Sequence, residues 1–565
     1  MATESVAEAY LDLLAARGIE YLFGNGGTDF GPIVEAYARR MAAEEPVPKP
    51  ITVPHEITAV AMAHGHTMVS GQPQAVMVHT IPGTANAVGG IINASRAQIP
   101  MLFTAGRTPL TEGSIRGSRD GGIHWAQESF DQGSMVREWV KWDYELRSGS
   151  NLETIVDRAL AIAKTVPTGP VYLTLPREVL SEEVESVAYS AQPRLTASET
   201  TAAPASLEHA AQVLAAARNP IAIAHGLGRD TRTVPLLVEL AELLGMGVFE
   251  SNPAYVNFPQ NHPLHVGFDG PSALPDADAV LVLESDVPWS PKRVSPRDGA
   301  TVIELAEDPL YSRYPVRGFP SDISLAGDLF LTLSGLLAAV KAQKIDKAAV
   351  AERSASWHEQ AIRHHQANVD RAEAARNKTP IAKPWFSHCV ELIHDDDTIV
   401  VNELGVDLTD LCFTKPGTLY GHAPSGGLGW ALGAALGAKL AAPDKTVICA
   451  VGDGSYIFGC PEAVHWVSRA HDLPVLFLIF NNAGWNAVAN ATRGIAPDGV
   501  AVKTRNFPFT DLSPQLDFEM FCQAAGGYGE RVEDPADLPN ALDRALHAVR
   551  VEKRQALLNV IGQRP

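Results

Sequence analysis

Two short motifs near the end of this chain, each directly after an apolar run, constrain its fold more than any other feature. Gly452-Asp453-Gly454-Ser455 follows the run 446–451, and Asn481-Asn482 follows the run 474–480, with 26 residues between Gly454 and Asn481. A strand–helix–strand unit of this length returns the chain to a neighbouring parallel strand, and open α/β sheets bind ligands at the carboxyl ends of such strands. The spacing therefore predicts an α/β domain in which both motifs meet at one ligand site.

The residue types in these motifs suit a divalent cation and a phosphate group. Asp453 supplies a carboxylate, Asn482 a carboxamide oxygen and Gly484 a backbone carbonyl. Three oxygen ligands, completed by phosphate oxygens and water, match octahedral Mg²⁺. Gly452 and Gly454 let backbone N–H groups approach a diphosphate at the positive end of the following helix. Ordinary turns would explain one such motif alone, but the second motif at this spacing favours a magnesium and diphosphate site.

Short apolar runs alternate with helical segments in three sets along the 565 residues, which predicts parallel sheets covered on both faces. We expect domains over 1–188, 204–341 and 380–565. The segment 190–203, rich in Ser, Thr, Ala and Pro, is a predicted linker, and the polar, helical segment 342–384 is the second connection. The predicted fold class is α/β with three parallel-sheet domains.

The first and third sets repeat one order of elements. A small-residue helix at 59–69 precedes a strand at 75–79, a glycine turn, another helix and the apolar run 99–103; residues 429–440, 446–451 and 473–477 follow the same plan. All parallel α/β domains share some of this order, so general likeness is the alternative explanation. We favour internal duplication, and we expect the first and third domains to share a fold.

Composition restricts the partners and the compartment. Lys and Arg number 45 against 65 Asp and Glu, and the resulting net charge of −20 argues against nucleic acid or an anionic membrane as a partner. The longest strongly apolar run, 473–480, is too short to span a bilayer. The N-terminal segment contains acidic residues among its apolar ones, unlike a signal peptide, in which a basic stretch precedes an apolar one. Five cysteines without a CxxC pair are typical of a reducing compartment, so we expect a cytoplasmic protein.

Gly452-Asp453-Gly454-Ser455, followed after 26 residues by Asn481-Asn482-Ala483-Gly484-Trp485, resembles the cofactor motif of thiamine-diphosphate-dependent enzymes. The likeness extends along the whole chain, in the branch of acetolactate synthase, pyruvate decarboxylase and benzoylformate decarboxylase. It implies pyrimidine-binding, middle and diphosphate-binding domains in that order. It also implies that thiamine diphosphate and Mg²⁺ bind between two subunits, so that the protein is at least a homodimer. We expect a homotetramer made of two such dimers. The implied cofactor contacts here are Gly452, Asp453, Gly454, Ser455, Asn482 and Gly484, of which Asp453, Asn482 and Gly484 bind the metal.

Two further segments resemble the family on the cofactor side. Glu56, at the start of a small-residue helix, is similar to a glutamate that hydrogen-bonds the aminopyrimidine of a cofactor held by the partner subunit. A carboxyl group buried beside an apolar helix would have a raised pKa and could share a proton with a ring nitrogen, which favours formation of the ylid. Alone, Glu56 would be interpreted as a carboxylate complementing a helix dipole.

The segment 425–433 resembles the "GGLGFALP" of benzoylformate decarboxylase, although close helix packing is its other explanation. The resemblance implies that the Gly426 carbonyl contacts the aminopyrimidine and that Leu428 is the wedge that bends the cofactor. By position, Gly405 and Val406 would meet the diphosphate side.

The resemblance also implies substrate-side residues. Thr28 falls where benzoylformate decarboxylase has its active-site serine, and His79 where it has a catalytic histidine. Gln127 resembles a glutamine of the synthase branch, which implies a polar group on the cofactor side. A histidine at the end of a strand can titrate near neutrality and move a proton. A core histidine bonded to backbone is the alternative for His79.

Two departures bear on the activity. The second histidine of benzoylformate decarboxylase has no counterpart in 284–291, and the histidine pair of pyruvate decarboxylases is missing near 108–122, although His124 lies close by. Another group must then deliver the proton, or an acceptor takes the intermediate. Gly226-Leu227-Gly228 alone does not assign FAD or ADP to the middle domain.

We expect a decarboxylase of 2-oxo acids, like benzoylformate decarboxylase, with carboligase activity. An enzyme like acetolactate synthase or 2-hydroxyacyl-CoA lyase is the alternative, and a non-catalytic paralogue is the third possibility.

Overall fold

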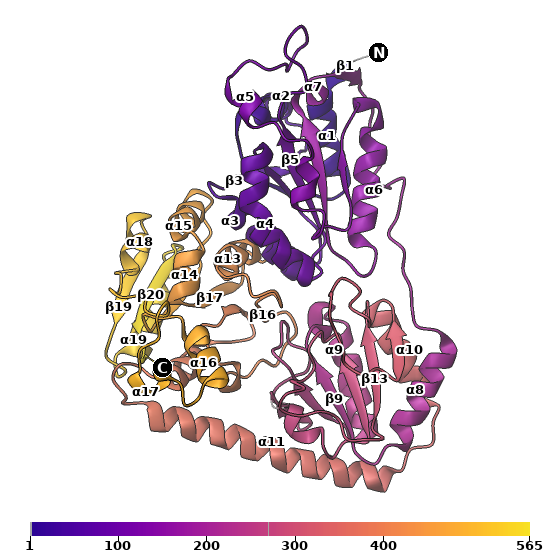
Figure 1. The fold of residues 1–565 in the computed structure, drawn as a ribbon, viewed down its shortest axis with the longest axis vertical. Coiled ribbons are helices and arrows are strands. Elements are labelled where there is room, and N and C mark those ends of the chain that lie inside the picture. The colour runs from indigo at the N-terminus through magenta and orange to yellow at the C-terminus, as the bar shows by residue number, and fades with distance from the viewer. Residues whose placement is uncertain (1–2, 269, 565) are drawn as a thin grey trace.

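The computed structural model describes residues 3–268 and 270–564, which form three α/β domains around three six-stranded sheets (Figure 1). All neighbouring strands within each of these sheets are parallel. The predicted fold class is therefore confirmed. Within the described residues, no helix combines the length and the apolar character that crossing a bilayer requires.

The first domain has the sheet order β3-β2-β4-β5-β7-β6. Its strands are β2 (Tyr21–Asn25), β3 (Lys49–Thr52), β4 (Ala75–Val78), β5 (Met101–Arg107), β6 (Asp143–Glu145) and β7 (Pro170–Pro176). Its helices are α1 (Val6–Ala16), α2 (Gly31–Ala42), α3 (Glu56–Ser70), α4 (Thr80–Arg96), α5 (Ile123–Ala126), α6 (Leu152–Lys164) and α7 (Arg177–Leu180), with the 3-10 turn η1 (Thr28–Phe30). A small antiparallel pair joins β1 (Thr3–Ser5) to β8 (Glu183–Glu185).

The middle domain has the order β11-β10-β9-β12-β13-β14. Its strands are β9 (Pro220–Ala224), β10 (Gly247–Glu250), β11 (His265–Gly267), β12 (Ala279–Leu283), β13 (Thr301–Ala306) and β14 (Ile323–Ala326). Its helices are α8 (Pro204–Ala216), α9 (Thr233–Leu244) and α10 (Leu329–Lys341), and α11 (Lys347–Ala375) runs from this domain to the third along the lower edge of the molecule in Figure 1.

The third domain has the order β16-β15-β17-β18-β20-β19. Its strands are β15 (Thr398–Glu403), β16 (Leu419–Gly421), β17 (Thr446–Gly452), β18 (Leu476–Asn481), β19 (Tyr528–Val532) and β20 (Ala556–Ile561). Its helices are α12 (Lys383–Ile393), α13 (Trp430–Ala441), α14 (Asp453–Phe458), α15 (Pro461–Ala470), α16 (Asn486–Ile495), α17 (Val500–Thr504), α18 (Glu519–Ala524) and α19 (Leu538–Arg550).

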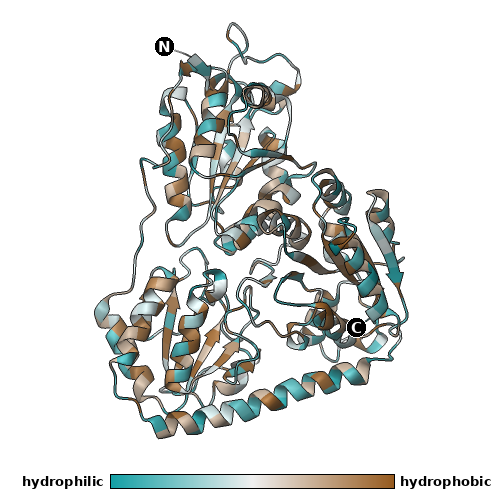
Figure 2. Cartoon of the chain, turned by 180° about the vertical axis from the view of Figure 1, so that it is seen from behind, coloured by the Kyte–Doolittle hydropathy of each residue, from teal (hydrophilic) through white to brown (hydrophobic). Residues whose placement is uncertain are grey.

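The first and third sheets have the same topology, because each places its second strand beside its first, then its third, fourth, sixth and fifth strands in that order. This confirms the expectation that the two domains share a fold. The central strands of all three sheets are buried and hydrophobic, whereas α11 is mostly hydrophilic (Figure 2). That contrast agrees with the interpretation of 342–384 as a polar connection.

Small residues bring α3 of the first domain into backbone contact with α13 of the third. A Cβ on Gly65 would lie 2.1 Å from the carbonyl oxygen of Ala434, and a Cβ on Gly437 would lie 1.9 Å from that of Met62. Real Cβ atoms do not approach so closely, so glycine is required for this contact. The helices that begin at Glu56 and just after Gly429 are thereby fixed against each other.

Candidate functional site

The two motifs of the third domain lie at the carboxyl ends of the neighbouring strands β17 and β18, as their spacing predicts. Asp453 is buried at the start of α14, and its two carboxylate oxygens accept the backbone N–H groups of Gly454 at 2.9 Å and Gly484 at 3.1 Å. Burial raises the pKa of Asp453. This carboxylate therefore ties the two motif loops together.

The polar atoms around Asp453 fit a cation and a diphosphate. The Oδ1 atom of Asn482 is buried and has no hydrogen-bond partner among the described residues. Gly452 faces open space, because a Cβ there would meet no atom within 4 Å, whereas Gly454 lies under the Trp485 ring. Among the described residues, no three His, Cys, Asp or Glu side chains are grouped so that they could hold a metal ion. The predicted ligand set does not need such a group, because Asp453 is its single carboxylate. An orphaned amide oxygen is the type of atom that a bound Mg²⁺ would satisfy.

The loop before α13, which carries Gly426 and Leu428, is held from two sides. The Glu403 carboxylate, at the end of β15, accepts the N–H groups of Gly429 at 2.7 Å and Ala431 at 2.8 Å, and it also hydrogen-bonds Ser455. Burial raises the pKa of Glu403 to about 7. Gly426 and Gly429 have φ angles of 65° and 79°, which favour glycine.

The opposite side of this loop is held by the first domain. Asn93 of α4 donates to the Gly427 carbonyl at 2.9 Å and accepts the hydroxyl of Ser425 at 2.6 Å. Gly405 and Val406 lie after β15 and donate their N–H groups to Asn402 at 3.1 Å each. Those two N–H groups are therefore already used, and a diphosphate contact by Gly405 and Val406 remains a prediction.

Glu56 is buried at the carboxyl end of the first sheet, where it begins α3. Its Oε1 accepts from Asn25 Nδ2 at 2.9 Å, and its Oε2 accepts from Asn86 Nδ2 at 3.1 Å. The two amides, from β2 and α4, fix the carboxylate from both sides. Neither Asn25 nor Asn86 was predicted as a site residue.

The structure places the predicted substrate-side residues Thr28 and His79 in one region, together with Gln127, which was predicted on the cofactor side. His79 follows β4, its Nδ1 lies 2.5 Å from Asp29 Oδ1, and its Nε2 lies 3.1 Å from Gln127 Nε2. Thr28 Oγ1 lies 3.3 Å from Nε2 of His124, a buried residue of α5. Asp29 was not predicted, and His124 was noted only for its position. The adjacency of β2 and β4 is the signal that could have placed residues 28 and 29 beside His79.

The pKa values of the two histidines of this cluster are shifted in opposite directions. Nδ1 of His124 accepts the backbone N–H groups of Asp120 at 3.2 Å and Gly121 at 3.3 Å, so Nε2 carries the proton and donates to Thr28. Burial lowers the pKa of His124, whereas the hydrogen bond that His79 donates to Asp29 raises the pKa of His79. Groups whose pKa values are pushed apart in this way are suited to different proton-transfer roles.

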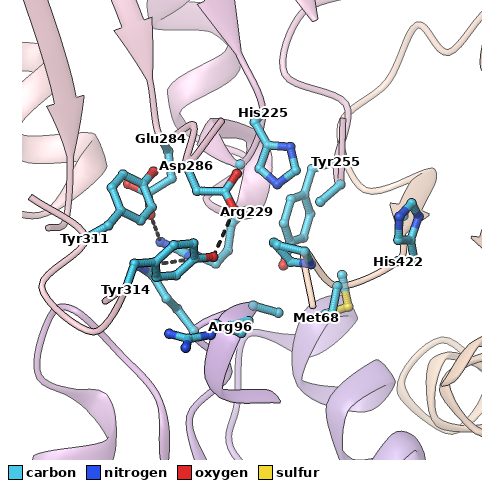
Figure 3. Close-up of a pocket in the computed structure, with 17 residues that line it drawn as sticks. Met68, Arg96, His225, Arg229, Tyr255, Glu284, Asp286, Tyr311, Tyr314 and His422 are labelled. Carbon is cyan, nitrogen blue, oxygen red and sulfur yellow. Dashed lines mark hydrogen bonds and ion pairs between the residues drawn. The ribbon is translucent and has the colours of Figure 1, made fainter. Parts of the chain in front are cut away.

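The middle domain has a small cavity of about 40 Å³ where all three domains meet, next to the ends of β9 and β12 (Figure 3). Arg229 crosses this region and pairs with Glu284 at 3.2 Å and Glu307 at 3.0 Å. The remaining volume is large enough for only a few water molecules. Gly226 and Gly228 are explained by packing, because a Cβ on each would lie 3.1 Å from the Glu284 side chain and 2.1 Å from the Val256 carbonyl oxygen, respectively.

Comparisons with known proteins agree with this geometry. The family model described as "Thiamine pyrophosphate enzyme, N-terminal TPP binding domain" matches residues 4–135, and that for the C-terminal TPP binding domain matches residues 406–560. The chain belongs to the thiamine pyrophosphate enzymes, the family also called thiamine-diphosphate-dependent. It is therefore a thiamine-diphosphate-dependent enzyme by family.

Similar proteins with assigned activities cover nearly the whole chain. Benzoylformate decarboxylase of Pseudomonas aeruginosa is 28% identical, with 97% of each chain covered. Sulfoacetaldehyde acetyltransferase of Castellaniella defragrans is 26% identical over 99% of this chain and 93% of its own. Among solved structures, benzoylformate decarboxylase from Polynucleobacter necessarius has a TM-score of 0.79 at 21% identity, with 99% of each chain covered, which shows the shared fold.

Proposed function

We propose that this protein is a thiamine-diphosphate- and Mg²⁺-dependent decarboxylase of 2-oxo acids that also joins the resulting acyl unit to an aldehyde. The observation that carries the proposal is the end-to-end similarity to benzoylformate decarboxylase, together with the cluster of Thr28, His79 and Gln127. Thiamine diphosphate, when bound, supplies the electron sink for breaking the bond next to the carbonyl. The protein supplies binding, orientation and proton transfer.

The residues divide into four groups under this proposal. Asp453, Asn482 and Gly484 hold the metal, and the Asp453 carboxylate also keeps the two loops together. Glu56, fixed by two amides, holds a proton for the aminopyrimidine. His79 holds a proton on the substrate side, and Thr28 orients the substrate through its hydroxyl, which also accepts a hydrogen bond from His124. The remaining cofactor contacts in the proposal are Gly405, Val406, Gly426, Leu428, Gly452, Gly454 and Ser455.

The proposal includes a site shared between two chains of a homodimer, with two dimers forming a tetramer. Large hydrophobic side chains support it, because they are exposed next to the site loops of both domains: Trp125 and Phe130 in the first, and Phe458, Ile495 and Phe509 in the third. Phe509 is 96% exposed, and association of two chains would remove such apolar surface from water. The free state of all five cysteines supports a cytoplasmic location.

The direct test is carbon dioxide release from a panel of aromatic and aliphatic 2-oxo acids, with and without an aldehyde acceptor. Release without an acceptor is the expected result, and an acceptor should divert part of the product to a 2-hydroxy ketone. If product forms only when an acceptor is present, the second candidate, an acyl-transferring synthase or lyase, replaces the first. That candidate is favoured by Gln127, which contacts His79, and by the sulfoacetaldehyde acetyltransferase relative.

Subunit complementation tests the shared site. Glu56→Gln and Asp453→Ala subunits, unfolded and reassembled together, should recover part of the activity, since some sites combine two intact halves. A fully active monomer in analytical ultracentrifugation would contradict this arrangement. A chain that binds the cofactor yet turns over none of the panel would support a non-catalytic paralogue.

A further inference from the structure

We propose that Asp29 is a positioning residue for His79, fixing the orientation of the imidazole so that Nε2 is the atom that exchanges a proton with the substrate. This inference rests on the proposed function of the same site. Asp29 lies in η1, directly after Thr28, and only 2% of it is exposed. Its Oδ1 is 2.5 Å from His79 Nδ1. Since a carboxylate only accepts, Nδ1 carries the proton of this hydrogen bond.

Two glycines on separate segments make room for the pair. A Cβ on Gly27 would lie 2.2 Å from His79 Nδ1, and a Cβ on Gly106, in β5, would lie 1.6 Å from Asp29 Oδ2. Gly27 has a φ of −140°, and Gly106 is not among the positive-φ glycines, so the backbone conformation does not require glycine at either position. The space itself is what these glycines provide, and Asp29 and His79 fill it.

Asp29 depends on His79 for its hydrogen bonding. Within residues 3–268 and 270–564, His79 is the side chain that pairs with Asp29, and Oδ2 of Asp29 is buried without a partner. A buried carboxylate is costly unless it is paired, so it favours the protonated imidazole. The other titratable groups that face His79 are Glu56 of α3 and His124 of α5, and Gln127 contacts it as a neutral amide.

Gln127 allows Nε2 of His79 to gain and lose a proton. Its Nε2 lies 3.1 Å from His79 Nε2, and its Oε1 is buried with no partner among the described residues. With the amide nitrogen toward the ring, Gln127 donates to a neutral His79; with the amide reversed, its oxygen accepts from a protonated His79. The proton given up at Nε2 is replaced from solvent, to which part of the ring is exposed.

The first test needs no substrate. Diethyl pyrocarbonate modifies neutral imidazole, so the pH dependence of His79 modification, read by mass spectrometry of its peptide, reports the protonation of His79. Asp29→Asn keeps the shape of the side chain and removes the charge, and it should move the midpoint of this dependence to lower pH. Asp120→Asn is the matched control, because Asp120 lies 3.4 Å from Nδ1 of His124 but its side chain is 72% exposed. An unchanged midpoint in Asp29→Asn would overturn the proposal.

The second test uses the 2-oxo acid that the wild type turns over. Asp29→Asn should lower kcat by about 10²-fold or more, leave KM and thiamine diphosphate affinity within about twofold, and move the alkaline fall of kcat to lower pH. Asp29→Glu should recover part of kcat. A double variant with His79→Ala should be no slower than His79→Ala alone, because Asp29 acts through His79. Additive losses, or wild-type kinetics in Asp29→Asn, would contradict the positioning role. If no 2-oxo acid is turned over, the proposed function fails while the modification test still decides the role of Asp29.

Discussion

Asn93, in the first domain, hydrogen-bonds both polar groups of Gly427 in the third domain. Its Nδ2 donates to the Gly427 carbonyl at 2.9 Å, and its Oδ1 accepts the Gly427 N–H at 3.1 Å. A Cβ on Gly427 would lie 2.6 Å from this Oδ1, so glycine is needed for so close an approach. The loop that carries Gly426 and Leu428 is therefore positioned by a residue from another domain of the same chain.

Asn93→Ala should weaken thiamine diphosphate binding by about tenfold, since it removes hydrogen bonds worth about 0.5–1.5 kcal/mol each and frees the loop. Isothermal calorimetry with saturating Mg²⁺ measures this affinity. Asn368→Ala is the control, because Asn368 also donates to a backbone carbonyl, that of Thr409, but lies on α11. Equal affinities in the two variants would show that Asn93 does not position the cofactor loop.

Gly65→Ala should destabilise the protein by about 1–3 kcal/mol, because its Cβ would meet the backbone of α13 at 2.1 Å and force α3 away. Urea unfolding monitored by circular dichroism gives the free energy. Gly89→Ala provides the contrast: it is exposed within α4 and its Cβ would lie 3.8 Å from Ile57, so the change should be neutral or stabilising. A Gly65→Ala protein as stable as the wild type would show that the two helices can separate at no cost.

Local sequence pattern predicts the central strands and the motif loops, because these depend on apolar runs and on spacing along the chain. It does not predict the short edge strands β3, β6, β16 and β19, because three to five residues of mixed polarity show no clear alternation of apolar and polar positions. The role of Asp29 could not be predicted from local sequence for another reason. Beside Thr28 it is typical of a helix cap, and its pairing with His79 depends on tertiary contacts between residues 50 positions apart. The contacts of Asn93 could not be predicted either, because its hydrogen-bond partners lie in another domain.

Asp453→Ala should lower the affinity for thiamine diphosphate by at least about 100-fold, since it removes the single carboxylate of the predicted magnesium site and the tie between the two loops. Fluorescence titration with the cofactor at several Mg²⁺ concentrations measures the loss. Asp444→Ala, at an exposed position of the same domain, should bind as the wild type does. Tight binding by Asp453→Ala would remove Asp453 from the metal site.

Glu56→Gln should slow exchange of the thiazolium C2 proton of bound thiamine diphosphate by about 10²–10⁴-fold, because the amide cannot relay a proton to the aminopyrimidine. Deuterium exchange, followed by NMR after acid quench, measures this without substrate. His79→Ala should leave the exchange rate nearly unchanged and lower turnover, since His79 is assigned to the substrate. Equal slowing in both variants would refute this division of roles. If His79→Ala altered neither rate, His79 would be structural.

Glu403→Gln should make the stability of the protein less dependent on pH between about 5 and 8. Burial raises the pKa of Glu403 to about 7 from an ordinary value of 4.5, so in this range the folded state holds a proton that the unfolded state has lost. The stabilisation from Glu403 is thus complete below about pH 4.5 and is lost as the pH rises to 7, at up to about 1.4 kcal/mol per pH unit. Glutamine cannot ionise, and its single amide oxygen can accept one of the two N–H groups, that of Gly429 or that of Ala431, so we expect the variant to lose overall stability without regaining a pH-dependent slope. Urea unfolding at pH 5, 6, 7 and 8 gives the slope, which should be shallower than in the wild type. Glu352→Gln, at an exposed position of α11, should retain the wild-type slope. Identical slopes in Glu403→Gln and the wild type would mean that Glu403 is already ionised in the folded protein and that the N-terminal end of α13 is capped by a permanent negative charge.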